Sequence, residues 1–140
     1  MKTQGEIEAE ICQGIGRIEQ EHMGRGPKNI CAHLIDDLLM IRMQGVLTAA
    51  EHQLVASVPA DKGRDLLKQV RTQLIETSKP LFETLIKEAT GVGVVSLHHD
   101  ISTAKGEEFL IFTLDAQPAF REKKKSCAGG PGPAVSKLMS

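Results

Sequence analysis

The residues of this chain best suited to chemistry lie in one short stretch, His98-His99-Asp100, which is followed by Ser102 and Thr103. Imidazole and carboxylate groups bind metals and transfer protons. The surrounding sequence predicts a β-strand, in which successive side chains point to opposite faces. His98 and Asp100 would then share one face and His99 the other. The two histidines therefore cannot bind one metal ion from a regular strand.

A metal site would need ligands from elsewhere in the chain, such as His33 together with Cys31. Tetrahedral zinc takes ligands of these types, but no spacing in the sequence matches a zinc motif. Asp, Ser and Thr side chains also bond readily to nearby backbone groups. We favour a hydrogen-bonded strand end here, and we predict neither a metal nor a cofactor.

A second candidate is the run Gly24-Arg25-Gly26-Pro27-Lys28. Its glycines expose backbone donors and its two cations add charge, which suits a phosphate or carboxylate. The run follows a predicted helix, so the helix dipole has the wrong sign for an anion. We favour a plain helix-to-strand connection. The alternative is one anion site built from both stretches, with Gly24, Arg25, Gly26, Lys28, His98, Asp100, Ser102 and Thr103 as its candidate residues.

Acid–base catalysis is a third interpretation. Asp36, Asp37, Asp100 and the histidines are titratable groups that could meet at one end of a sheet. The sequence leaves open whether the turns of the two predicted hairpins lie at the same edge or at opposite edges. It shows no nucleophile paired with a base. We therefore predict that the protein is not an enzyme.

Composition narrows the functional class. The chain has 140 residues, of which 41% are hydrophobic and 25% charged, as in one ordinary globular domain. The net charge of −1, with four Phe and neither Tyr nor Trp, argues against nucleic-acid binding. The three cysteines form no C-x-x-C pair, which suits a reducing cytoplasm. No secretory signal and no apolar run of about 20 residues is visible, so we expect a soluble chain that does not span a membrane.

The sequence predicts an α+β fold in the order α-ββ-α-α-ββ, with helices packed on one face of a mostly antiparallel four-stranded sheet. Apolar periodicity, T-x-x-E capping boxes at Thr3 and Thr48, and glycines after the helices mark its elements. In chain order these are helix 4–22, strands 29–35 and 38–44, a short helix ending near 57, helix 61–90, and strands 94–103 and 107–115. Residues 1–118 form one domain, and 119–140 have the composition of a flexible tail.

Three local features add detail to this fold. Asp36-Asp37 is a two-residue turn in which one Asp must adopt a positive φ. Gly14 and Gly16 in the first helix predict close packing against another helix or a partner. Pro80 should kink the long helix without ending it.

The apolar stripe of the long helix bears on the oligomeric state. Leu67, Val70, Leu74, Leu81 and Leu85 trace the stripe. Together with its neighbouring apolar residues, it has more apolar surface than one face of a four-stranded sheet covers. We therefore predict a homodimer that buries the excess across a two-fold interface.

Several separated segments, in order, resemble the MpsC-like family. They are G-E-I-E-A-E-I from Gly5, M-G-R-G-P-K from Met23, G-V-L-T with A-E from Gly45, Gly91 to Val95, and Ser96 to Thr103. The resemblance covers Gly5 to about Asp115. It implies a component of a sodium-translocating, membrane-potential-generating system that is also linked to inorganic-carbon uptake. It implies no catalytic residues.

Because no membrane span is predicted, the resemblance implies an accessory or regulatory subunit. Such a subunit would be cytoplasmic, peripheral to the inner face of the membrane, and bound to a membrane transporter complex. The alternative is a small-anion or nucleotide sensor that uses Arg25, Lys28 and the loop after His98. We expect no nucleic-acid partner in either case.

Overall fold

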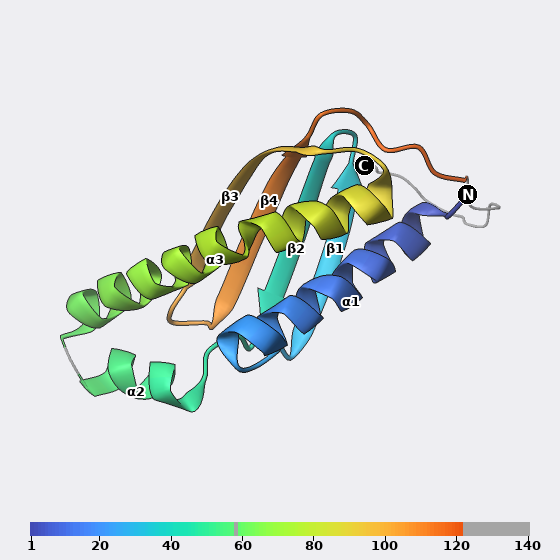
Figure 1. Ribbon diagram of the computed structural model, residues 1–140. Helices are drawn as coiled ribbons and strands as arrows, with labels where there is room; N and C mark the ends of the chain where they lie inside the picture. The colour runs from blue at the N-terminus through green and yellow to red at the C-terminus, as the bar shows by residue number, and fades with distance from the viewer. Residues whose placement is uncertain (58, 122–140) are drawn as a thin grey trace.

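The structure is a computed structural model that describes residues 1–57 and 59–121. Its helices and strands are α1 (Gln4–Met23), β1 (Asn29–Ile35), β2 (Leu38–Gln44), α2 (Ala49–Ser57), α3 (Ala60–Thr90), β3 (Val94–Ser102) and β4 (Glu107–Leu114). This order confirms the predicted one. Helices α1 and α3 lie side by side on one face of the sheet, with α2 near the end at which β2 finishes (Figure 1).

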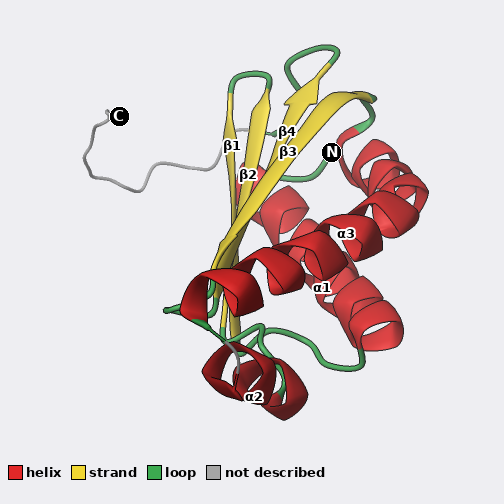
Figure 2. Cartoon of the chain, turned by 90° about the vertical axis from the view of Figure 1, so that its left-hand side faces the viewer, coloured by secondary structure: helices red, strands yellow, loops and turns green. Residues whose placement is uncertain are grey.

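The four strands form one antiparallel sheet in the order β1-β2-β4-β3. The α+β prediction, with helices on one face, is confirmed. No described helix covers the opposite face, which Figure 2 shows at the left of the sheet. The strand β2 is followed in the sheet by β4, so the two hairpins join along their second strands. Strands β1 and β3 are therefore the two edges.

Both predicted capping boxes are formed. At α1, the Thr3 hydroxyl accepts a hydrogen bond from the N–H of Glu6 at 3.2 Å, and the Glu6 carboxylate accepts one from the N–H of Thr3 at 2.8 Å. At α2, Thr48 and Glu51 exchange the same two bonds, at 3.2 and 2.9 Å. Each box satisfies N–H groups that the first turn of a helix leaves without partners.

Replacing the first of these caps should weaken the fold measurably. We expect Thr3→Ala to lower the free energy of unfolding by about 1 kcal/mol, because the N–H of Glu6 loses its acceptor. Urea denaturation measures the change. Thr72→Ala is the matched control: Thr72 is exposed inside α3, where Ala is the better helix former, so this variant should be no less stable than the parent. Equal losses in the two variants would contradict the capping role.

Glycines and one aspartate supply the left-handed backbone that the turns require. Gly24 ends α1 with φ 79° and Gly91 ends α3 with φ 81°. In the β1–β2 turn, Asp36 adopts φ 56°, which confirms that one Asp of the pair takes a positive value. Helix α3 continues through Pro80.

Close contact between α1 and α3 depends on Gly14. A Cβ atom at this position would lie 2.4 Å from Cδ1 of Leu85 on α3, so any larger residue would force the Leu85 side chain to move. The predicted close packing is confirmed at Gly14, whereas a Cβ at Gly16 would meet no atom within 4 Å.

Helix α1 also covers the free edge of β1. Gln4 Nε2 donates to the carbonyl of Leu34 at 2.9 Å, and the N–H of Leu34 donates to Glu8 Oε2 at 2.9 Å. One turn further along, the Cys12 thiol donates to the carbonyl of Ile30 at 3.9 Å. Side chains spaced by four residues thus occupy backbone groups that would otherwise be open to another strand.

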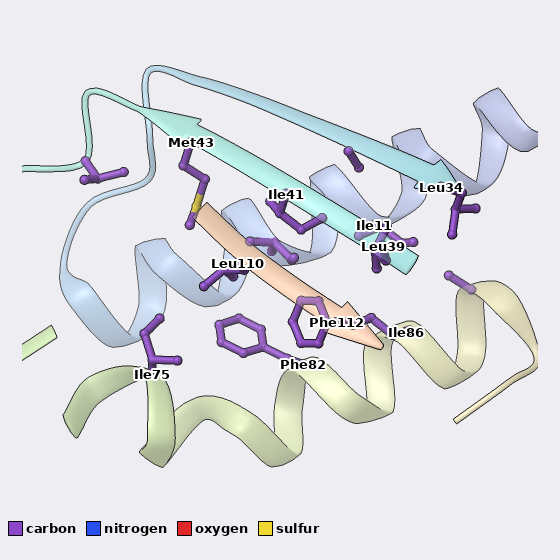
Figure 3. Close-up of a cluster of buried hydrophobic side chains, with 14 of the residues drawn as sticks. Ile11, Leu34, Leu39, Ile41, Met43, Ile75, Phe82, Ile86, Leu110 and Phe112 are labelled. Carbon is purple, nitrogen blue, oxygen red and sulfur yellow. The ribbon is translucent and has the colours of Figure 1, made fainter. Parts of the chain in front are cut away.

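The core lies between the two long helices and the sheet (Figure 3). The rings of Phe82 on α3 and Phe112 on β4 meet edge to face, with centroids 6.2 Å apart. Around them pack the inward residues of every strand and of both helices; those labelled in Figure 3 are Ile11, Leu34, Leu39, Ile41, Met43, Ile75, Ile86 and Leu110.

Part of the predicted apolar stripe of α3 points away from this core. Leu66, Val70 and Leu81, which we call the outer flank of α3, are 44%, 43% and 43% exposed. The surplus apolar surface expected from the sequence is therefore present on the chain. The homodimer inferred from it stays a prediction.

The first residues of the predicted tail contact the N-terminal segment of the chain. The N–H of Arg121 donates to the carbonyl of Lys2 at 2.7 Å. Phe120 packs against the core, so the described chain stays in contact with the domain beyond residue 118. The rest of the predicted tail, from 122 onward, lies outside the described residues.

Candidate functional site

The two stretches proposed as one anion site lie at the same end of the sheet but on its opposite edges. Residues 24–28 lead into β1, and His98 to Thr103 end β3. The strand register aligns Asn29, Gln44, Glu107 and Ser102 in one row. Three strand spacings separate the ends of this row, or about 14 Å. The two stretches are therefore separated by β2 and β4 and the loops that follow or precede them.

Donors of the Gly24–Lys28 run are engaged within the protein. Arg25 Nη1 donates to the carbonyl of Leu47 at 3.2 Å, and the N–H of Gly26 donates to Gln20 Oε1 at 3.0 Å. The N–H of Lys28 donates to the carbonyl of Gln44 at 2.8 Å. These bonds hold the α1–β1 connection against the end of β2 and the loop after it. The anion site stays a prediction.

Alternation along β3 separates the two histidines as expected. His98 and Asp100 are exposed on the open face of the sheet, while the half-buried His99 points to the helix side, with its Nε2 3.9 Å from Glu76 Oε2 on α3. Among residues 1–57 and 59–121, no three His, Cys, Asp or Glu side chains form a group that could hold a metal ion.

Asp100 forms an ion pair with a lysine that the sequence analysis did not single out. Lys68 Nζ on α3 lies 3.0 Å from Asp100 Oδ1, which also accepts from the N–H of Ile101 at 2.9 Å. The hydrogen bond from Lys68, and then that from Ile101, lower the pKa of Asp100 below its ordinary value. Ser102 and these three residues, together with Glu107 and Phe109, line a shallow pocket of about 320 Å³.

The aspartates considered for acid–base chemistry do not gather at one end. The β1–β2 turn, with Asp36 and Asp37, lies at the end of the sheet opposite to the β3–β4 turn (Figure 1). Asp100 lies toward the β3–β4 turn, in a row with Phe109. The sequence left open where the two hairpin turns lie relative to each other, and the structure places them at opposite ends of the sheet.

The most unusual group of side chains was not singled out from the sequence. Arg71 on α3 is surrounded by Glu19 of α1, Glu51 of α2 and Glu108 of β4, and we call these four residues the buried charge cluster. Arg71 Nη2 lies 2.5 Å from Glu108 Oε1 and 3.3 Å from Glu19 Oε1, and Nη1 lies 3.8 Å from Glu51 Oε2. The side chains of Arg71, Glu19 and Glu108 are 2%, 1% and 1% exposed.

The buried charge cluster holds more carboxylates than cations. If all four side chains were ionised, three negative charges would surround one positive charge. The second oxygens of Glu19 and Glu108, both Oε2, have no hydrogen-bond partner among residues 1–57 and 59–121. Burial, and then the charge of Glu108, raise the pKa of Glu19 from the ordinary 4.5 to about 7, against the opposing effect of Arg71. Burial raises the pKa of Glu108 as well, again against Arg71.

Periodicity in the sequence did contain the signal for this cluster. Glu108 occupies an inward position of β4, two residues before Leu110, and Glu19 continues the α1 stripe four residues after Ile15. Arg71 lies four residues after Leu67 on the buried face of α3. A charged residue at a core position of each of three elements is the pattern to look for, because such residues are rarely buried unless paired.

Comparison with known proteins identifies the family. The model of the family described as "Na+-translocating membrane potential-generating system (MpsC)" matches residues 3–116. The chain is 32% identical over 113 residues to the uncharacterized protein YbcI of Bacillus subtilis, covering 81% of this chain and 89% of YbcI. It is 29% identical over 103 residues to the uncharacterized protein YrhF of the same organism, covering 72% and 81% of the two chains. No solved structure matches.

The matched region takes in every helix and strand of the domain, from the capping box at Thr3 to the end of β4. It includes all four residues of the buried charge cluster and all five segments that carried the resemblance seen in the sequence. Within the described residues, none of the helices is both long enough and apolar enough to cross a membrane. The chain belongs to the MpsC family.

Proposed function

We propose that this chain is a non-enzymatic accessory or regulatory subunit of a sodium-translocating, membrane-potential-generating system. The observation that carries the proposal is the family match over residues 3–116, whose description names such a system. A chain without a spanning helix among its described residues would act by docking on a membrane-embedded partner. In this proposal the chain is cytoplasmic and binds a transporter complex at the inner face of the membrane.

The geometry supports a non-enzymatic role. The aspartates available for acid–base chemistry lie at different ends of the sheet, and general acid–base partners must reach the same substrate. Asp100, which lies within the segment Ser96 to Thr103 that carries the resemblance, is paired with Lys68. The proposal therefore assigns the chain to binding and regulation.

Co-purification from membranes tests the proposal. The tagged chain, expressed in its own host, should elute with integral membrane proteins after extraction in a mild detergent, and cross-linking before extraction should increase their yield. The matched control is the same tag on an unrelated domain of similar size. A chain that elutes without any membrane protein under both conditions would overturn the accessory role.

The homodimer is part of the same proposal and has its own test. Val70→Glu with Leu81→Glu should convert a dimer to a monomer, because two charges would be placed in an apolar interface on the outer flank of α3. Sedimentation equilibrium measures the mass. Gln73→Glu, exposed on the same helix, is the control and should leave the mass unchanged. A parent chain that is monomeric at all concentrations would contradict the prediction.

A small-anion or nucleotide sensor is the alternative function. Its support is the shallow pocket that holds Lys68 and Ser102, but Asp100 already neutralises Lys68 there. Thermal shifts with bicarbonate, phosphate and ATP test it. Stabilisation by one of these anions, lost in Lys68→Ala, would favour a sensor that uses this pocket. If none of these anions raises the melting temperature, the sensor function is ruled out as an alternative to the accessory role.

A further inference from the structure

The buried charge cluster joins four elements at one point. Glu19 comes from α1, Glu51 from α2, Arg71 from α3 and Glu108 from β4. Glu51 also belongs to the capping box of α2: its Oε1 accepts from the N–H of Thr48 at 2.9 Å, while its Oε2 faces Arg71. The charge state of the cluster is thus connected directly to the start of α2.

Negative charges outnumber positive ones in the cluster, and the buried Oε2 atoms of Glu19 and Glu108 could each accept one more donor. Glu19 and Glu108 direct Oε1 at the same atom, Arg71 Nη2, and their buried Oε2 atoms have no partner in the part of the chain that the structure describes. Ionising both carboxyls there is unfavourable, because each Oε2 has lost water and gained no donor, and both Oε1 atoms depend on one nitrogen of Arg71. A proton on one of the two carboxyls would remove a negative charge and create an O–H donor.

We propose that the buried charge cluster is an exchangeable proton-binding site, in which Glu19 and Glu108 share one proton above Arg71 and its release loosens the junction of α1, α2 and β4. A metal ion is the less suitable occupant, since the described residues contain no group of three carboxylate, imidazole or thiolate side chains arranged to hold one. This inference does not depend on the proposed accessory function.

Within the described residues, the charged and titratable groups that act on Glu19 and Glu108 come from α2, α3 and β3, besides the two carboxyls themselves. Arg71 of α3 contacts both carboxyls and also Glu51 of α2. His99 of β3 acts electrostatically on Glu108. His99 in turn lies 3.9 Å from Glu76 of α3. A positive charge on His99 would favour the ionised form of Glu108, so His99 opposes proton uptake, whereas the charge of Glu51 favours it.

The direction of the pH effect follows from the pKa of Glu19. The folded-state pKa is about 7 and the ordinary value, taken for the unfolded chain, is 4.5. Between these values the folded chain binds more protons than the unfolded chain, so stability falls as pH rises. Between pH 4.5 and pH 8 this difference in pKa corresponds to a rise of about 100-fold in the unfolding equilibrium constant.

Thermal and urea unfolding between pH 5 and pH 9 test this site. For the parent chain we expect the unfolding equilibrium constant to rise by about 10- to 100-fold between pH 5.5 and pH 8. Glu19→Gln, a neutral isostere of the protonated carboxyl, should remove most of this dependence and be more stable than the parent at pH 8. Glu21→Gln, exposed on the same helix, is the matched control and should keep the parent profile.

A second measurement detects the proton directly in the parent chain. In the parent chain labelled with carboxyl-13C glutamate, one resonance should titrate with a midpoint near pH 7, and Glu19→Gln should remove it. Replacing sodium chloride by choline chloride should not move the midpoint; a shift would identify a bound sodium ion and overturn the proton assignment. Glutamate resonances that all titrate below about pH 5.5 would overturn it as well.

Discussion

Arg71→Met should lower the free energy of unfolding by about 3–5 kcal/mol at pH 7, because it leaves Glu19 and Glu108 buried without the cation that contacts both. Met has a similar length and packs flexibly, so the loss reports the missing charge more than a cavity. Urea denaturation measures the change. Arg64→Met, on the same helix, is the control: Arg64 is half exposed and pairs only loosely with Asp65 at 3.5 Å, so we expect a change within about 0.5 kcal/mol.

The same substitution tests whether the cluster acts as one unit. In the triple variant Arg71→Met, Glu19→Gln, Glu108→Gln no ionised carboxylate faces the missing guanidinium. It should therefore be more stable than Arg71→Met alone, a non-additive result expected for side chains in one network. A triple variant that is less stable by the sum of the single losses would contradict the electrostatic account. The electrostatic account would also be contradicted if Arg71→Met were as stable as Arg64→Met.

Local chemistry is what made the elements predictable. The capping boxes at Thr3 and Thr48 act over three residues, the glycines after the helices act at single positions, and alternation in a strand repeats every second residue. Each signal is complete within a few consecutive residues. The positions of all helices and strands could therefore be predicted within one or two residues, along with the positive φ in the Asp36-Asp37 turn.

Relations between elements were not encoded in this way. The pairing of β2 with β4 joins Arg42 to Phe109 and Met43 to Glu108, residues far apart in the chain. Nothing within either hairpin determines whether β2 or β1 faces the second hairpin. The sequence therefore left open the distance between Gly24–Lys28 and His98–Thr103, which the strand order β1-β2-β4-β3 determines.

The cluster was missed for a related reason. Glu19, Arg71 and Glu108 each look like an ordinary surface charge in a list of residue types, and charged residues are the ones least expected in a core. Their burial depends on α1, α3 and β4 meeting at one place, and each carboxylate is tolerated only because the arginine of another element is there. Only the assembled fold shows that three charges in separate elements belong together.

Phe82→Ala should lower the free energy of unfolding by about 3–5 kcal/mol, as expected for an aromatic residue with no exposed surface. The ring joins α3 to the sheet through its edge-to-face contact with Phe112, so its loss removes both apolar burial and an aromatic pair. Urea denaturation at low protein concentration measures the change. An effect below about 1 kcal/mol would mean that α3 is not anchored to the sheet at this point.

Leu81→Ala, one position earlier, is both the control and a test of the outer flank of α3. Leu81 is 43% exposed on the single chain, so truncating it should have a much smaller effect than Phe82→Ala at low protein concentration. If two copies associate through this flank, the loss should grow as the protein concentration rises, because the dimer buries Leu81 and dimer formation stabilises the fold by mass action. A loss that stays small and independent of concentration would place the two-fold interface elsewhere on the chain. The neighbouring residues Leu81 and Phe82 thus separate the apolar surface that α3 uses to fold from the surface that it leaves for a partner.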